Sequence, residues 1–594
     1  MAEYTSGAIH FTGLGNGTDF DTMINQLKQI EMIPMQRLAL WKADWQKRQD
    51  AFMEVRKELL NLRNVAAKMN TVEKFLAKNV ASSNNTVAVA TATSGVLEGN
   101  YRIEVNQLAT NAVFSINTGL ADPSENINPG SSPLYFSYKY AGGDERIITV
   151  PPGTTLEGLK NLINNDAQNP GVRANLIKTS GGYVFQFQGM DLGEEHSLEI
   201  TGTGPFPPIT AWEEQQSQDA EIKINNWPGT GWLSLSSNTI SDVIEGLTIN
   251  LRDTGVTVLT VTMDVEKIQE NVQELLDAIN TFRVKILELT KWDENKNTVA
   301  TDVANSQFEM QKGSVLTGNY GVQLLSSQLK QAVADMPIGF ERLSQDSGGI
   351  WTGDVYTSLS QLGIFTYATG NTGADNYGML VFDEKAVVSF VQALAADPQS
   401  LAEFFAADNI GVSDSPDFSF YSQVKTITEA GSYTVEYSID GFGNVTGTIN
   451  GKTANYDPAT HQLTLARGDN SNPADGIVIN IDNLAAGNYE GTVRIKQGKV
   501  NELLRLLDGS PSNPAEGMLG SSGALAILNN NYQRIMDNIN TKIEKENERI
   551  IKWERVTRAR FARLDATLAK YDQLNSAIES QIKQLSSNTS SSSS

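Results

Sequence analysis

Apolar side chains recur at every third or fourth position across residues 35–69, and Arg48 is the one interruption of the series. No Gly or Pro lies inside this stretch, and Pro34 stands where a helix can begin. The pattern predicts a helix that is about 50 Å long at 1.5 Å per residue and that ends near Lys78. Because its apolar stripe is narrow, the helix needs partner helices. The stripe consists of Leu38, Trp41, Trp45, Phe52, Val55, Leu59, Leu62, Ala66 and Met69.

A second stripe with the same spacing begins nearly 200 residues later. We expect the two stripes to pack together, with the intervening residues as an insertion between the two helices. Further helical patterns cover 322–333 and 384–405. The second stripe consists of Val265, Ile268, Val272, Leu275, Ile279, Phe282, Ile286 and Leu289.

Between the helical stretches, apolar and polar residues alternate with turn residues at short intervals, which predicts β-structure. The block at 79–263 is expected to hold two subdomains: an inner one at about 79–118 plus 219–263, and an outer one at about 119–218. A second β block is expected at 411–499.

Helical spacing returns after Val500 and continues to Leu585, and the serine-rich residues 586–594 are expected to be disordered. Basic residues cluster on this last helix; they form either a solvated face or a binding face for an acidic protein. The cluster consists of Arg555, Arg558, Arg560 and Arg563. The apolar positions beside it are Phe561, Leu564, Leu568, Tyr571, Ile578, Ile582 and Leu585.

The predicted fold class is therefore α+β multidomain. N-terminal, middle and C-terminal helices form a helical bundle or coiled-coil base that carries inserted β-rich domains. Residues 1–34 are an N-terminal leg expected to pair with a C-terminal leg, with a bend at Pro34. The expected divisions are 1–34, 35–78, 79–263, 264–410, 411–499, 500–554 and 555–594.

Charge and cysteine content exclude several classes of function. The 594 residues include 46 Lys plus Arg and 69 Asp plus Glu, a net charge of −23, which argues against nucleic-acid binding. Cysteine is absent, so disulfides and thiol chemistry are excluded. The N-terminal residues lack the pattern of a cleavable signal peptide, and no stretch reaches the roughly 18 apolar residues of a membrane span. We expect a protein without membrane insertion that is either cytosolic or exported by a route that reads no signal peptide.

No catalytic, cofactor or metal motif stands out, so we expect neither an enzyme nor a metalloprotein. The three histidines, His10, His196 and His461, are far apart in sequence. The adjacent glutamates at 194–195 and 213–214 point apart in any regular element and cannot face one bond. The glycines at 13–17 are read as a turn and helix cap, and the loop at 469–476 as a turn without calcium-loop spacing.

Several motifs together resemble the flagellar filament capping proteins, the flagellar hook-associated protein 2 family. They are Gly-Leu-Gly-Asn-Gly-Thr-Asp at 13–19, Gly-Asn-Tyr-Arg-Ile-Glu-Val-Asn-Gln-Leu-Ala at 99–109, and Asn-Thr-Ile-Ser-Asp-Val-Ile-Glu-Gly-Leu-Thr at 238–248. Leu-Gly-Ile at 362–364 and Gly-Met-Leu-Val-Phe-Asp at 378–383 follow in the same order. The block at 411–499 departs from the family pattern and resembles an insertion.

The resemblance implies an extracellular protein at the distal tip of the bacterial flagellum, exported through the flagellar type III apparatus without a signal peptide. It implies a ring-shaped homo-oligomer, expected to be a pentamer, that retains flagellin and promotes its folding and insertion. The implied partners are a second copy of the chain, flagellin, the hook–filament junction proteins and a cytosolic export chaperone. The helical legs would contact the filament, and the C-terminal helix would contact the chaperone.

Other functions remain open at this point. An extracellular adhesin or host-surface binder would use the exposed β blocks. Another flagellar axial protein, such as a junction protein or a flagellin, would share the terminal helices. An enzyme inserted in the scaffold would need a pocket with paired carboxylates.

Overall fold

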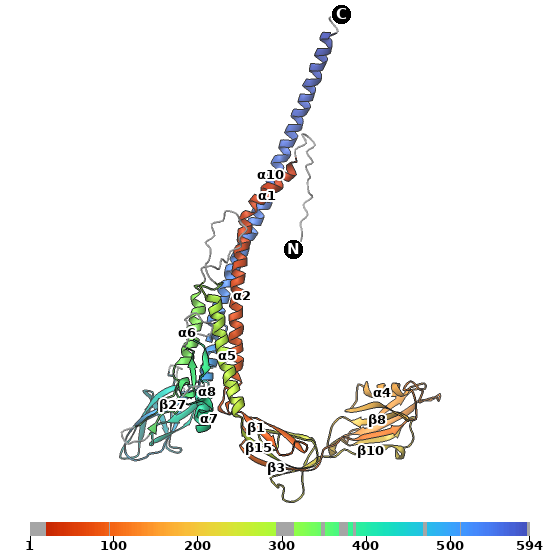
Figure 1. The fold of residues 1–594 in the computed structure, drawn as a ribbon, viewed down its shortest axis with the longest axis vertical. Helices are drawn as coiled ribbons and strands as arrows, with labels where there is room; N and C mark the ends of the chain where they lie inside the picture. Colours follow the sequence, from red (N-terminus) through yellow and green to blue (C-terminus); the bar gives the residue numbers. More distant parts are fainter. Residues whose placement is uncertain are drawn as a thin grey trace. The chain divides into compact units, whose positions relative to one another are not determined.

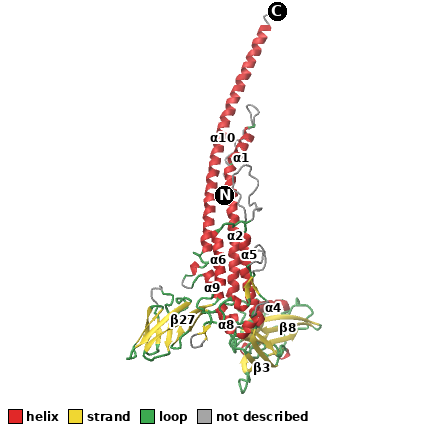
Figure 2. Cartoon of the chain, turned by 60° about the vertical axis from the view of Figure 1, so that its left-hand side comes forward, coloured by secondary structure: helices red, strands yellow, loops and turns green. Residues whose placement is uncertain are grey.

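The computed structural model describes residues 19–93, 95–292, 314–345, 351–367, 378–383, 388–466, 472–510 and 513–590. The chain forms two compact units. Unit 1 comprises Met1–Ala67, Gln273–Ser389 and Asn409–Ser594; unit 2 comprises Lys68–Val272 and Phe390–Asp408. Figure 2 shows the long helices α2, α5, α6 and α10 of unit 1 in red and strand β27 of its sheet in yellow.

Unit 1 is built on long helices, and α1 and α2 follow one another end to end along α10 (Figure 1). The longest, α10, has 67 residues and contains neither Gly nor Pro, so nothing in the sequence ends it early. It continues through Ser590, into the serine-rich segment expected to be disordered, and no break separates a leg at 555. The helices with residues in unit 1 are α1 (Phe20–Glu31), α2 (Ile33–Ala67), α5 (Val265–Thr290), α6 (Tyr320–Ala334), α9 (Lys499–Asp508) and α10 (Ala524–Ser590).

A bend is predicted at Pro34. The structure has a short interruption two residues earlier, at Met32, between α1 and α2. Helical hydrogen bonds cross it: the Met32 N–H donates to the Lys28 carbonyl at 2.9 Å, and the Gln36 N–H donates to the Met32 carbonyl at 2.9 Å. Pro34 lies in the first turn of α2, where its missing N–H costs no hydrogen bond. The interruption therefore keeps both helices along α10.

The first long helix ends earlier than predicted. Helix α2 stops at Ala67, and a four-residue helix, α3 (Val72–Phe75), precedes strand β1 (Lys78–Ser82). Asn70 and Thr71 explain the stop, because such side chains bond to the backbone outside helices. The Thr71 hydroxyl accepts the Lys74 N–H at 3.2 Å and caps α3.

The second β block forms one eight-stranded sheet in unit 1, in the order β20-β27-β22-β23-β24-β25-β26-β21. Alternate side chains of its strands are buried in a common apolar core. The strands span 408–497, within three residues of the predicted block. They are β20 (Asp408–Ser413), β21 (Phe418–Ser422), β22 (Gly431–Ile439), β23 (Val445–Ile449), β24 (Lys452–Asp457), β25 (Gln462–Thr464), β26 (Val478–Ile481) and β27 (Gly487–Gln497).

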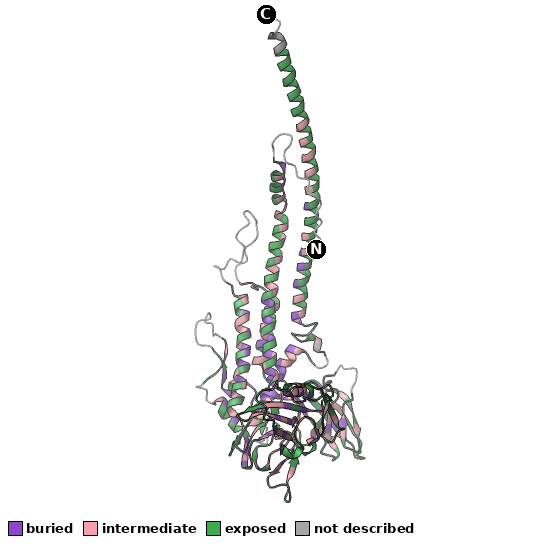
Figure 3. Cartoon of the chain, turned by 90° about the vertical axis from the view of Figure 1, so that its right-hand side faces the viewer, coloured by how far each residue is buried: buried purple, intermediate pink, exposed green. Residues whose placement is uncertain are grey.

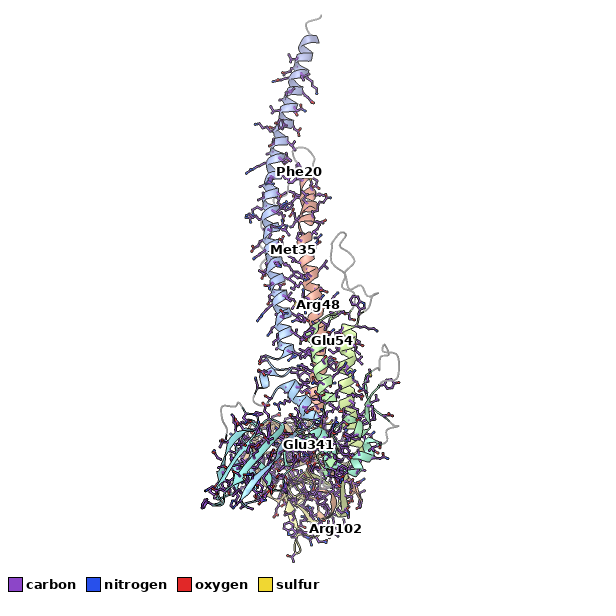
Figure 4. The ribbon with its side chains drawn as sticks, turned by 90° about the vertical axis from the view of Figure 1, so that its left-hand side faces the viewer. Phe20, Met35, Arg48, Glu54, Arg102 and Glu341 are labelled. Atoms are coloured by element: carbon purple, nitrogen blue, oxygen red, sulfur yellow. The ribbon has the colours of Figure 1, made fainter. Side chains whose placement is uncertain are left out.

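A buried ion cluster joins β27 to the rest of unit 1. The Arg494 guanidinium bonds both carboxylate oxygens of Asp414, at 2.7 and 2.8 Å, and donates to Asp354 at 2.5 Å. Lys496 lies 2.6 Å from the other oxygen of Asp354. Burial alone would lower the Arg494 pKa, but the bond to Asp414 and the charge of Asp354 raise it. Glu341 lies at the edge of the cluster, 3.7 Å from Arg494 (Figure 4).

The middle block, predicted as helical over 264–410, contains both helices and short strands. Between α6 and α7 (Phe390–Ala396) the described residues form short antiparallel hairpins in place of bundle helices, whereas the helical pattern predicted at 384–405 corresponds to α7 and α8 (Pro398–Ala406). The strands are too short, at two or three residues, to give a period in the sequence. They are β16 (Ser344–Gln345), β17 (Trp351–Thr352), β18 (Ile364–Thr366) and β19 (Leu380–Phe382).

Unit 2 contains an inner β region whose strands come from both sides of the predicted outer subdomain. Two sheets, β1-β15-β3-β11-β12 and β13-β14-β2, share one apolar core. Helices α7 (Phe390–Ala396) and α8 (Pro398–Ala406) also belong to unit 2, where Phe405 stacks on Phe75 of α3. The inner strands after β1 are β2 (Ala88–Ala92), β3 (Gly99–Gln107), β11 (Ala220–Ile224), β12 (Leu233–Leu235), β13 (Thr239–Ile240), β14 (Leu247–Leu251) and β15 (Gly255–Met263).

The outer β region of unit 2 has its own aromatic core around Phe136, Phe185 and Phe187. It begins earlier than predicted, because β4 pairs with β8 and buries Phe114 in this core. Its sheets are β10-β4-β8-β7 and β6-β5-β9. The elements are β4 (Val113–Asn117), β5 (Leu134–Tyr140), β6 (Arg146–Val150), α4 (Leu156–Asn164), β7 (Val172–Thr179), β8 (Gly182–Gly189), β9 (Leu198–Thr203) and β10 (Glu213–Gln215).

Candidate assembly interface

The N-terminal helix α1 docks on α10 through two apolar residues. Asp19 caps the helix by accepting the Thr22 N–H at 3.0 Å, and this bonding lowers the pKa of Asp19. Phe20 and Ile24 are buried, and the Phe20 ring lies 5.3 Å from that of Phe561 on α10 (Figure 4). Within unit 1, α1 therefore lies against the part of α10 around residues 549–561, and α10 continues beyond this contact to Ser590.

Three ion pairs fix the register of α1 on α10. Lys28 lies 2.8 Å from Glu554, Arg558 lies 2.7 Å from Asp21, and Arg549 lies 2.6 Å from Glu31. Arg558 also bonds Glu554, at 3.1 Å. Arg558 of the predicted basic cluster therefore serves a contact within the chain.

The other three arginines of the cluster are exposed: Arg555, Arg560 and Arg563.

Further toward the start of α10, the aromatic residues of α2 meet Tyr532. The Tyr532 ring lies 5.6 Å from Trp45 and contacts the edge of Phe52 at 5.7 Å. Asn319 donates a hydrogen bond to the Tyr532 hydroxyl. Tyr532 was not predicted from the sequence, because few regularly spaced apolar residues precede it on α10.

The apolar stripe of α2 is buried in its second half alone. Phe52, Val55, Leu59 and Leu62 are fully buried, whereas Leu38 and Trp45 are half-buried and Trp41 remains 38% exposed beneath Lys542. The first half of this predicted bundle stripe therefore lies outside the core of the chain.

The stripe of α5 is buried nearly throughout, and Lys285 of this helix lies 3.5 Å from Glu54 of α2. Val265 is half-buried. The buried members are Ile268, Val272, Leu275, Ile279, Phe282 and Ile286.

Beyond its contact with α1, α10 carries an apolar stripe that the described chain leaves uncovered (Figure 3). We call this the distal stripe. Phe561, which precedes the stripe, and Leu568, which lies within it, are half-buried. The exposed members are Leu564, Tyr571, Leu574, Ile578, Ile582 and Leu585. Met23, Leu27 and Ile30 of α1 are exposed as well.

Acid should loosen α1. The bonds to Lys28 and Arg558 lower the Glu554 pKa below its ordinary value of 4.5. A carboxyl with a lowered pKa stabilises the docked state above its ordinary pKa, and the stabilisation is lost as the pH falls through the lowered value. We expect a loss of about 0.5–1 kcal/mol from this partly exposed pair. Spin labels at Gln26→Cys and Arg555→Cys would report a broader distance distribution in acid.

Glu554→Gln is the control for this measurement. It should show the looser distribution at neutral pH and a weaker pH dependence. An unchanged pH dependence in Glu554→Gln would assign the effect to other groups.

The described residues offer no metal-binding group of three acidic, histidine or cysteine side chains. His461 bonds the Tyr456 hydroxyl at 2.9 Å, and His196 lies 4.0 Å from Asp191. His10, the glycines at 13–17 and residues 469–471 of the predicted loop lie outside the described residues. The rest of that loop, 472–476, forms a turn in which the Asp475 N–H donates to the Asn472 carbonyl at 3.0 Å. Within the described ranges, every helix is too short or too polar to cross a bilayer.

Comparison with known proteins places these features in one family. The family model for the flagellar hook-associated protein 2 C-terminus matches residues 217–573, and that for the N-terminus of the same protein matches residues 16–112. The B-type flagellar hook-associated protein 2 of Pseudomonas aeruginosa is 25% identical over 425 residues, which cover 67% of this chain and 80% of that protein. The lateral flagellar hook-associated protein 2 of Vibrio parahaemolyticus is 29% identical over 261 residues, which cover 40% of this chain and 57% of that protein.

Solved structures give a similar match. The crystal structure of the D1–D2–D3 domains of the flagellar cap protein FliD from Escherichia coli is 23% identical. The match covers 61% of this chain and 92% of that chain, with a TM-score of 0.42.

Proposed function

This chain belongs to the flagellar hook-associated protein 2 family, and from that premise we propose that it is a structural cap at the distal end of a bacterial flagellar filament. In this role it acts outside the cell as a ring of identical copies, most simply a pentamer. It retains exported flagellin and promotes its folding and insertion beneath the cap. It carries out no enzymatic reaction.

The distal stripe of α10 is the observation that supports this proposal most strongly. A helix hydrophobic on one face is stable when another surface covers that face. In the proposed cap, helices of flagellin or of a junction protein cover the stripe at the filament tip. Before export, a cytosolic chaperone covers the same residues. The exposed Arg555, Arg560 and Arg563 add charge for an acidic partner.

A substitution in the distal stripe tests the proposal. The variant Leu574→Ser/Ile578→Ser/Ile582→Ser removes three exposed apolar side chains, each worth roughly 1.5–3 kcal/mol when buried. We expect the purified chain to melt unchanged and its filament contact to weaken by more than about 100-fold. Cells that carry this variant as their sole copy should release unassembled flagellin and grow short filaments or none.

The matched control is Gln573→Ser/Ser576→Ala/Ser580→Ala on the opposite face of α10. Control cells should grow normal filaments. Normal filaments in cells with the stripe variant would refute the role of the distal stripe.

A further inference from the structure

A groove of about 610 Å³ opens in unit 1 between α5, α6 and the β18–β19 hairpin. Its walls are mostly apolar, and the acidic residues that dominate this chain are absent from its described lining. Two cations, Arg283 and Lys330, line it instead. The apolar lining includes Ile279, Leu329, Val333, Ile364, Phe365 and Leu380.

The charge of Arg283 is poorly compensated. This half-buried guanidinium donates to the carbonyl of Gly378, and burial lowers the pKa of Arg283. Neither Arg283 nor Lys330 forms an ion pair with a carboxylate in the described part of the chain. A partly desolvated cation without a counter-charge favours an anionic ligand. The groove therefore suits an apolar group that carries a carboxylate.

The chain itself presents such a group at the tip of the hairpin between β22 and β23. Phe442 is 94% exposed there, although turns are usually made of small polar residues. Asp440 holds the tip in shape, since its carboxylate accepts the N–H groups of Phe442 and Asn444 at 2.9 and 2.8 Å. It also accepts the Asn444 side-chain amide at 2.8 Å, and these bonds lower the Asp440 pKa.

We propose that the Phe442 tip of one copy docks into this groove of a second copy. The ring fills the apolar part of the groove. Asp440 brings its negative charge toward Arg283 while its oxygens keep the bonds of the turn. The aromatic tip and the apolar groove match in polarity, and the carboxylate and the cations match in charge.

This contact joins two different surfaces, the Phe442 tip of one copy and the groove of the next. Every copy carries both a tip and a groove, so the contact repeats head to tail, and such contacts close into a ring or continue as a fibre. The inference goes beyond the filament contact of the distal stripe. It rests on the proposed cap in one respect, namely that copies of the chain meet.

Disulfide trapping tests the contact directly, because the chain has no cysteine of its own. One chain carries Phe442→Cys and a size tag, and a second carries Thr366→Cys on the exposed edge of the groove. We expect a mixed disulfide-linked dimer on mild oxidation. The control replaces the first variant with Ser432→Cys, an exposed position at the other end of β22, and should give no such dimer.

Two results would overturn the contact. One is equal trapping by the Phe442→Cys and Ser432→Cys chains. The other is self-association in sedimentation without trapping at Phe442→Cys; in that case the cap proposal still stands, since its test uses the distal stripe.

Phe442→Ala gives an independent measurement without cysteine chemistry. The ring makes almost no contact in the single chain, so the melting temperature should not change. Self-association should weaken by about tenfold or more, as for other buried aromatic anchors. Unchanged self-association would overturn the proposal.

Discussion

Phe52→Ala is expected to destabilise the helical part of unit 1 by about 3–5 kcal/mol, the usual cost of removing a large aromatic side chain from a core. Phe52 is 0% exposed, and its ring forms a T-shaped pair with that of Tyr532. Its loss removes the buried surface and one member of an aromatic pair between α2 and α10. Hydrogen exchange of α2 and α10 peptides would show the loss as faster exchange in both helices.

Met53→Ala is the matched control, one residue along the same helix. Met53 is 43% exposed, so we expect a change within about 0.5 kcal/mol. Equal effects of the two substitutions would mean that α2 does not pack through Phe52.

Arg494→Met should destabilise the eight-stranded sheet and its attachment by about 3 kcal/mol, because breaking a buried ion pair leaves an uncompensated charge. Asp414 would lose both of its bonds to the guanidinium. The expected value lies at the lower end of the usual range because Lys496 still offsets the charge of Asp354. Exchange of amides in β22 and β27 would measure the change.

The same substitution at Arg63 provides the control. Arg63 bonds Asp508 at 2.7 Å, but both side chains are more than a third exposed. Arg63→Met should therefore cost less than about 1 kcal/mol. If both variants lost equal stability, burial would not account for the strength of the Arg494 cluster.

Local patterns predicted many elements of this fold because they depend on neighbours in sequence. Alternating apolar and polar residues predicted β-structure in the block at 79–263, where strands such as β11 and β14 are found. The second β block was likewise placed from its alternating strands and turn residues.

Contacts between distant residues explain the misses. Strand β4 was not predicted as part of the outer β region. Its burial there depends on pairing with β8, more than 60 residues later, which no local pattern shows. The partners of Arg494 lie 80 and 140 residues away, so no local signal marks that cluster. For Trp41, the periodicity could not show that its ring, although it faces Lys542 of α10, stays 38% exposed.

The helices that close unit 1 also set an order of folding. Gln49 of α2 bonds Asn529 of α10, and Arg558 bonds Asp21, across 480 and 537 residues of chain. Contacts of such long sequence separation form late, because the whole intervening loop must be closed first. The β regions close shorter loops, since even the pairing of Lys78 with Met263 in the inner region spans fewer residues, and each region can fold as it is completed. A chain that emerges N-terminus first must therefore hold α1 and α2 without their partner until nearly its last residues have appeared.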